Sequence, residues 1–135
     1  MLYFRGYISS RKLEDNNLID QSVQNLVIRK ACEKHGFVYM LSATEYGMKN
    51  CFLMFNQVIL DLKKGKSDGI ALYSYEQLPR DFKIREKLYE AIIKNKKRIL
   101  ISLEDILIEN KNDIKSFEEL MKIKFLLKFS PKSII

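Results

Sequence analysis

The chain has 135 residues and a mass of 16.0 kDa, so we expect a single domain with no room for a second catalytic one. Its composition, 47% hydrophobic and 30% charged with five Gly and two Pro, excludes a largely disordered or fibrous protein. The formal net charge of +7 raises the question of an anionic partner: nucleic acid, a membrane surface or a phosphorylated small molecule.

The first forty residues predict a strand, a helix and a second strand. The apolar run from Leu2 to Ser9 is typical of a strand that opens into a polar loop. Apolar residues then recur at helical spacing between Asp20, a plausible N-cap, and His35, with Gly36 as the stop. The short run 37–42 follows directly and predicts a strand covered on both faces.

The next sixty residues repeat this alternation. A helix is predicted over Cys51–Leu62, and it is apolar on more than one side, so we expect it to contact the sheet and a further helix or subunit. Ile70–Tyr75 predicts a third strand, Asp81–Lys94 a third helix and Arg98–Leu103 a fourth strand. Each strand is thus followed by a helix long enough to cross over the sheet.

This order predicts a small doubly wound, three-layer α/β domain with a mostly parallel sheet of four or five strands, because parallel neighbours need crossover connections. We assign it to residues 1–110. Residues 111–135 are expected to add a C-terminal helix, capped by Asp113 and running over Ile114–Leu127, and a loose tail, packed on the domain or extending from it.

In such sheets a ligand binds beyond the carboxyl ends of the strands, where the strand order reverses, here between the first and third strands. The loops that follow the strands carry hydroxyl, amide and guanidinium groups. The predicted binding residues are Ser9, Arg11, Ser42, Thr44, Glu45, Tyr46, Ser74, Gln77 and Arg80, with Ser10 and Glu76 as candidate catalytic residues. Arg11 and Arg80 would grip a phosphate or carboxylate through their planar forks. The alternative interpretation is a set of solvated caps and turns.

Several kinds of chemistry have no motif in the sequence. Neither glycine-rich nucleotide motif occurs, and a single histidine and two cysteines in no metal spacing predict no cofactor and no metal. We expect His35 to cap a helix and Cys32 and Cys51 to be free thiols. With no long apolar segment and no signal peptide, we expect a cytoplasmic protein without membrane insertion.

Two stretches resemble the catalytic domain of serine recombinases, the resolvases and invertases. They are Gly6-Tyr7-Ile8-Ser9-Ser10-Arg11 and Glu76-Gln77-Leu78-Pro79-Arg80. The family opens with Gly-Tyr-x-Arg-x-Ser, which carries the nucleophile, and ends its third strand in Asp-Arg-Leu-x-Arg. Here the family arginine falls on Ser9 and its nucleophile on Arg11, with Ser10 one residue early; only Leu78 and Arg80 remain of the second motif. The resemblance implies a related fold over roughly residues 3–103. The departures from both motifs weaken the case for strand-exchange activity. Nothing after position 103 predicts a long dimer helix or a DNA-binding domain.

Four further blocks resemble sporadic carbohydrate cluster proteins of bacterial surface-polysaccharide gene clusters. They are Phe4–Arg11, Val23–Arg29, Leu41–Tyr46 and Asp68–Ser74, the last running into Gln77-Leu78-Pro79. This resemblance implies a role in making lipopolysaccharide, capsule or related glycans, without a defined reaction. The hypothesis that follows is a crevice that binds an anionic carbohydrate intermediate, a sugar phosphate or nucleotide sugar, through Arg11 and Arg80.

Two alternatives remain open: a recombinase-like DNA-binding or strand-exchange protein, and a non-catalytic interaction protein that forms a homo-oligomer through the Cys51–Leu62 helix. The distribution of the charge gives little support to a nucleic-acid partner. Residues 1–60 carry 7 Lys and Arg against 5 Asp and Glu, and residues 61–135 carry 17 against 12, so the excess lies in scattered residues of the second half. They lack the aromatic interleaving of a single-strand binding face.

Overall fold

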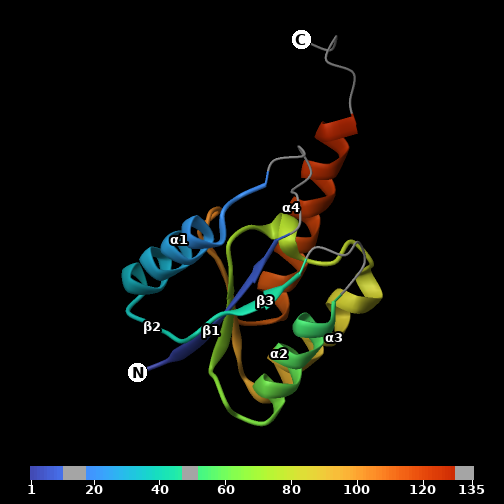
Figure 1. The fold of residues 1–135 in the computed structure, drawn as a ribbon. Helices are drawn as coiled ribbons and strands as arrows, with labels where there is room; N and C mark the ends of the chain where they lie inside the picture. Colours follow the sequence, from blue (N-terminus) through green and yellow to red (C-terminus); the bar gives the residue numbers. More distant parts are fainter. Residues whose placement is uncertain (11–17, 47–51, 130–135) are drawn as a thin grey trace.

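The computed structural model describes residues 1–10, 18–46 and 52–129, which form one mixed sheet with helices on both faces (Figure 1). In chain order the elements are β1 (Tyr3–Ser9), α1 (Gln21–Lys34), β2 (Val38–Tyr39), β3 (Ala43–Glu45), α2 (Leu53–Lys63), β4 (Gly69–Leu72), the short 3-10 helix η1 (Tyr75–Gln77), α3 (Phe82–Asn95), β5 (Arg98–Ile101), β6 (Ile106–Ile108) and α4 (Lys111–Phe129).

The strand order is β2-β1-β4-β5-β6, and β3 also pairs with β1. All pairs are parallel except β5 with β6. The chain therefore winds to one side of β1 and then to the other, so the order reverses between β1 and β4. The predicted doubly wound class is confirmed, as is the predicted position of the reversal between the first and third predicted strands.

The predicted strand over 37–42 is wrong in its bounds, because the chain runs beside β1 in two pieces. The register changes from Phe4↔Tyr39 to Tyr7↔Ala43, so one extra residue lies in the outer strand, as at a β-bulge. The Tyr39 side chain packs directly over Gly6 of β1 at the break between the two pieces. A Cβ on Gly6 would lie 2.3 Å from the hydroxyl oxygen of Tyr39. The strand therefore resumes at Ala43, and Thr44 and Glu45 belong to it rather than to a loop.

Side chains alternate between two cores, one on each face of the sheet. Phe4 and Ile8 pack with Ile28 and Cys32 of α1 on one face. On the other face Tyr7 packs in the larger core, whose members from α2, α3 and α4 are Phe55, Val58, Ile59, Leu62, Leu88, Tyr89, Ala91, Ile92, Phe117 and Met121. Figure 1 shows the same three layers. The apolar breadth of α2 reflects its position between the sheet and α3.

The segment after β5 differs from its expected form. A tight turn with Asp105 at φ +56° leads into the antiparallel strand β6. Helix α4 then begins at Lys111, three residues before the predicted start, because Asn110 and not Asp113 caps it. The Asp113 amide donates to Asn110 Oδ1 at 2.9 Å, and Asp113 Oδ2 accepts from the Glu109 amide at 2.9 Å.

The predicted C-terminal helix is confirmed, and at 19 residues α4 is longer than the expected Ile114–Leu127 segment. Its first half packs Phe117 and Met121 into the core, and its second half extends beyond the rest of the described domain (Figure 1). None of the helices in the described part of the chain is long and apolar enough to cross a membrane.

Candidate functional site

The carboxyl ends of β1, β3, β4 and β5 meet at one edge of the sheet, where the sequence predicted a crevice. The structure brings Ser9, Glu45, Ser74 and Gln77 to this edge, each with at most 3% of its surface exposed. Buried polar groups need partners, so their hydrogen bonds decide whether they are available to a ligand.

A pair of buried glutamines joins the ends of β1 and β4. Gln24 of α1 accepts from the Ser9 amide at 3.1 Å and donates to the Ser9 carbonyl at 2.8 Å and to the Ile19 carbonyl at 2.8 Å. Gln77 donates to Gln24 Oε1 at 2.5 Å and accepts from the Tyr73 amide at 2.9 Å. We call Gln24 and Gln77 the amide clamp; it bridges the point where the strand order reverses.

The second internal arrangement uses Glu45 at the end of β3. Its carboxylate accepts from the amides of Met54 and Phe55 at 3.1 and 3.2 Å, and from the hydroxyl of Tyr7 at 3.2 Å. These amides are in the first turn of α2, where donors lack helical partners and negative charge is favoured. Glu45 therefore serves as a cap of α2 supplied from outside the helix.

Ser74 and Glu104 form a third arrangement at the ends of β4 and β5. Ser74 caps η1 by accepting from the Glu76 amide at 3.3 Å and donates to Glu104 Oε2 at 3.1 Å. Glu104 also accepts from the Tyr75 amide at 2.9 Å. Burial raises the pKa of Glu104 above its ordinary value, although the two donors oppose the shift.

The remaining predicted residues are more open. Ser10 is half-buried directly after β1, and its amide donates to the Glu45 carbonyl at 3.0 Å. Arg80 is exposed, and Tyr46 is 69% exposed. Ser42, Thr44 and Glu76 are half-buried. Arg11 and Cys51 lie outside the described residues.

Sequence reasoning missed four residues at or beside this edge: Gln24, Glu104, Arg85 and Glu118. Gln24 lies on the buried side of α1, four residues before Ile28, and an amide on that apolar stripe was the available signal. Arg85 of α3 donates to Glu118 of α4 at 2.6 and 3.0 Å and to the carbonyls of Pro79 and Arg80 at 2.9 and 2.6 Å. No local pattern relates these positions, because α3 and α4 meet only in the folded chain.

Glu118 stands at the centre of a buried polar group that fixes the base of α4. Tyr89 donates a hydrogen bond to the same carboxylate. Burial disfavours the charge of Arg85, but the hydrogen bond and charge of Glu118 outweigh this effect and raise its pKa. Burial, followed by the hydrogen bond to Glu118, also raises the pKa of Tyr89, so the phenol stays protonated.

His35 and Cys32 lie away from the carboxyl edge, at and near the end of α1. His35 ends α1 and lies 2.9 Å from Asp105, which also accepts from Lys34 at 2.6 Å. Burial raises the pKa of Cys32 to about 11, which keeps it a thiol. Within residues 1–10, 18–46 and 52–129, no group of three metal-ligating side chains occurs.

The fold and this edge define a class: a small doubly wound α/β domain with an antiparallel edge strand and a long C-terminal helix, similar to resolvase catalytic domains. The N-terminal catalytic domain of TP901-1 integrase superimposes with a TM-score of 0.62 and 19% identity over 92% of this chain and 96% of that chain. A resolvase family site-specific recombinase from Streptococcus pneumoniae gives 0.63 and 13% identity over 90% and 87%. No family model and no curated protein matches the chain.

At these identities the likeness establishes the fold. The predicted resemblance to the serine recombinase catalytic domain is therefore confirmed for the fold. No comparison supports the polysaccharide-cluster family or a carbohydrate ligand.

Proposed function

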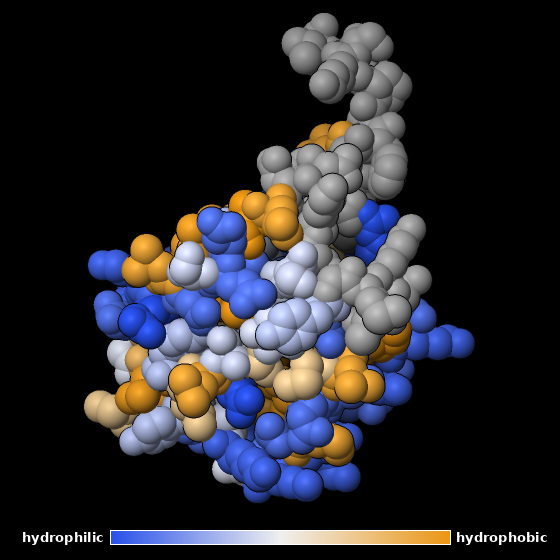
Figure 2. All heavy atoms as spheres, in the orientation of Figure 1, coloured by the Kyte–Doolittle hydropathy of each residue, from blue (hydrophilic) through white to orange (hydrophobic). Residues whose placement is uncertain are grey.

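We propose that this chain is a self-associating DNA-binding protein built on the recombinase catalytic fold. The observation that carries the proposal is the exposed apolar side of α4. Leu120, Ile123 and Leu127 are 36%, 55% and 68% exposed and follow the three- and four-residue spacing of a helix seam. Figure 2 shows apolar surface at the projecting end of this helix.

A second copy of α4 suits this seam. Met121 and Phe117 occupy the side of the helix that faces the core, so the seam is a separate face of the same helix. Lys124, one turn before the end of the seam, lies 5.1 Å from the ring centroid of Tyr75, beside the strand ends. Pairing through the seam would therefore set two strand-end edges near one another, a geometry suited to a duplex.

DNA is the proposed ligand for two reasons. The similar solved structures are an integrase catalytic domain and a site-specific recombinase. The net charge of +7 supplies the general attraction that phosphate backbones require. The scattered lysines would attract the phosphate backbone without selecting a base sequence, because sequence readout needs a defined surface that contacts the base edges.

The proposal does not include strand exchange. Ser9 stands where the recombinase pattern has an arginine, and it is buried and held by Gln24. Gln77 stands where that pattern has another arginine, and its amide is also used internally. A phosphoryl-transfer site needs cations on the transferred group, and these two positions supply none.

Light scattering tests self-association. The wild type should give about twice the monomer mass of 16.0 kDa, and the double variant Ile123→Asp, Leu127→Asp should give the monomer. Lys122→Asp is the matched control, because position 122 lies on the opposite side of α4 and should leave the dimer intact. A monomeric wild type would contradict the proposed pairing. An analogous Leu53→Asp, Leu60→Asp variant tests the predicted contact through α2.

Fluorescence anisotropy with a 30-base-pair duplex tests DNA binding. The apparent affinity should fall steeply between 50 and 200 mM salt, by about a thousandfold if six phosphates are contacted. Absence of binding at 50 mM salt, together with thermal stabilisation by a nucleotide sugar, would overturn the proposal in favour of the carbohydrate hypothesis. A covalent DNA adduct that Ser10→Ala abolishes would overturn the exclusion of strand exchange.

A further inference from the structure

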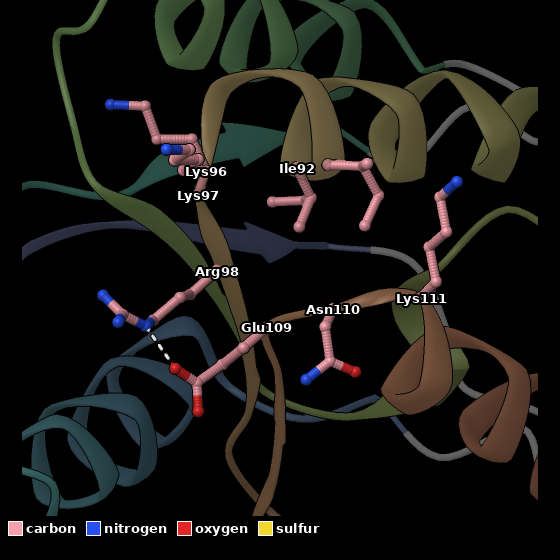
Figure 3. Close-up of a pocket in the computed structure, with 8 residues that line it drawn as sticks. Ile92, Lys96, Lys97, Arg98, Glu109, Asn110 and Lys111 are labelled. Atoms are coloured by element: carbon pink, nitrogen blue, oxygen red, sulfur yellow. Dashed lines mark hydrogen bonds and ion pairs between the residues drawn. The ribbon is translucent and has the colours of Figure 1, made fainter.

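At the amino edge of the sheet, opposite the candidate site, a groove runs between α3 and the start of α4. Two cavities of about 350 and 400 Å³ form it and share Ile93 and Lys111. Figure 3 shows the residues that line the first of them. Tyr89 and Ile93 of α3 supply its apolar lining. We call this feature the basic groove.

Cations from four segments surround the basic groove. They are Lys94 of α3, Lys96 and Lys97 of the following turn, Arg98 of β5 and Lys111 of α4. The carboxylates that line it are Glu90 and Glu109, and Glu109 pairs with Arg98 at 2.6 Å. No ion pair within the described part of the chain engages any of the four lysines.

The backbone at Lys96 gives an independent reason to assign a role to this groove. Lys96 ends α3 with φ 54° and ψ 48°, in the left-handed region. The corresponding turns after α1 and α2 place Gly36 and Gly65 there, at φ +74° and +76°. A side chain in this conformation costs roughly 1 kcal/mol relative to glycine. The third helix therefore keeps a cation where the chain twice uses glycine.

Lysines at helix C-termini also stabilise the helix dipole, which is the simplest alternative role for Lys94 and Lys96. That role does not need a left-handed Lys96, because Lys94 in the last turn already provides it. Nor does it account for Lys111, which begins a different helix. The four lysines line the same two cavities although they come from the ends of two different helices.

We propose that the basic groove binds an acidic peptide segment of a partner protein that anchors one apolar side chain against Tyr89 and Ile93. Charge complementarity selects an acidic partner, and the apolar lining selects a peptide over nucleic acid, whose backbone offers phosphates but no aliphatic anchor. The residues that line the groove include none of the seam residues Leu120, Ile123 and Leu127 and neither glutamine of the amide clamp. It therefore stands or falls separately from the proposed DNA binding.

The test uses fluorescein-labelled 12-residue peptides rich in Asp and Glu with a central Leu, Ile or Phe, read by anisotropy on the full chain. At least one should bind saturably, and replacing its central residue by Ser should weaken binding about tenfold. The double variant Lys97→Ala, Lys111→Ala should also weaken it at least tenfold. The matched control Lys63→Ala, Lys64→Ala removes two lysines from the end of α2 and should leave the affinity unchanged.

Lys96→Gly separates a binding role from a structural one. Relief of the left-handed strain should raise the melting temperature by roughly 2–5 °C, while the peptide affinity falls. A lysine that only supports the helix would show no loss of peptide binding. The proposal is overturned if no peptide binds, if the α2 control loses affinity equally, or if the groove variants reduce duplex DNA binding while leaving peptide binding unchanged.

Discussion

The two edges of the sheet both collect polar side chains, but they use them in opposite ways. At the carboxyl edge, Gln24, Gln77 and Glu45 are buried and bonded to backbone or to one another. At the amino edge, Lys96 and Lys111 are exposed and have no ion-pair partner in the described part of the chain. A polar residue at a strand end is thus available to a ligand only when the fold has not already used it.

The comparison also explains why the carboxyl edge needs so many internal bonds. Here the crossover helix α2 begins and the order of strands reverses, so several backbone donors and acceptors lack partners within a helix or strand. Side-chain amides and carboxylates form hydrogen bonds with these backbone groups. The amino edge has no reversal to bridge, and its lysines remain in solvent.

The largest effect should come from Glu118→Ala, which leaves Arg85 and Tyr89 buried without their shared partner. Loss of one member of a buried ion pair costs about 3–5 kcal/mol in unfolding free energy. Urea denaturation followed by circular dichroism measures it. Glu119→Ala, an exposed neighbour, is the control and should change little. A loss below about 1 kcal/mol would mean that the base of α4 is held by its apolar contacts alone.

Next in size is Gln24→Leu, which removes the centre of the amide clamp. The Ser9 amide and carbonyl and the Gln77 amide would lose partners, at a cost of about 2–4 kcal/mol. Gln21→Leu, on the same helix, should be nearly neutral. An unchanged denaturation midpoint for Gln24→Leu would show that the amide clamp does not stabilise the carboxyl edge.

Glu45→Gln should have a smaller effect, because the neutral amide can still accept one hydrogen bond from the first turn of α2. The loss of charge near these amides should cost about 1–2 kcal/mol. Hydrogen exchange should speed up at the amides of Met54 and Phe55. Glu33→Gln, at an exposed position, serves as the control. Unchanged exchange at both amides would contradict the capping role.

The smallest effects concern pH, and two adjacent carboxyls should act in opposite directions. Hydrogen bonds from Lys34 and then His35 lower the pKa of Asp105 below its ordinary 3.8, so its stabilisation is present above that value and is lost as pH falls through the folded pKa. Burial raises the pKa of Glu104 above 4.5, so stability declines as pH rises from that value through the folded pKa.

Urea unfolding between pH 3 and 7 separates the two carboxyls. Asp105→Asn should remove the stabilisation gained on raising the pH from its acid limit, and Asn tolerates the left-handed backbone at that position. Glu104→Gln should remove the decline at higher pH. Matching pH profiles for both variants and the wild type would show that neither environment differs from that of the unfolded chain.

The elements that could be predicted were those marked by local patterns. Helices α1 and α3 lie within one residue of their expected ends, because amphipathic spacing is contiguous in sequence. Asp81 caps α3 by accepting from the Lys83 amide, whereas Asp20 precedes α1 without a side-chain cap bond. The break between β2 and β3 could not be predicted, since it depends on Tyr39 lying over Gly6 of another strand. The early start of α4 depends on the choice between two neighbouring cap residues, Asn110 and Asp113.

The candidate site divides in the same way. Loop position alone brought Ser9, Glu45, Ser74 and Gln77 to one edge, as the order of strands required. Their partners, Gln24, Met54 and Glu104, lie between 9 and 53 residues away along the chain, and no spacing rule relates such positions. Only the packed chain shows that these polar groups satisfy one another.

The sequence by itself determined the alternation of strands and helices, the reversal between the first and third predicted strands, and the excess of lysine in the second half. Periodicity and crossover geometry are local or topological, so they can be read without coordinates. The tertiary structure decided which polar residues are consumed internally, where α4 presents an apolar seam and where lysines surround a groove. Burial and partner choice are properties of contacts between distant segments, and these exist only in the folded chain.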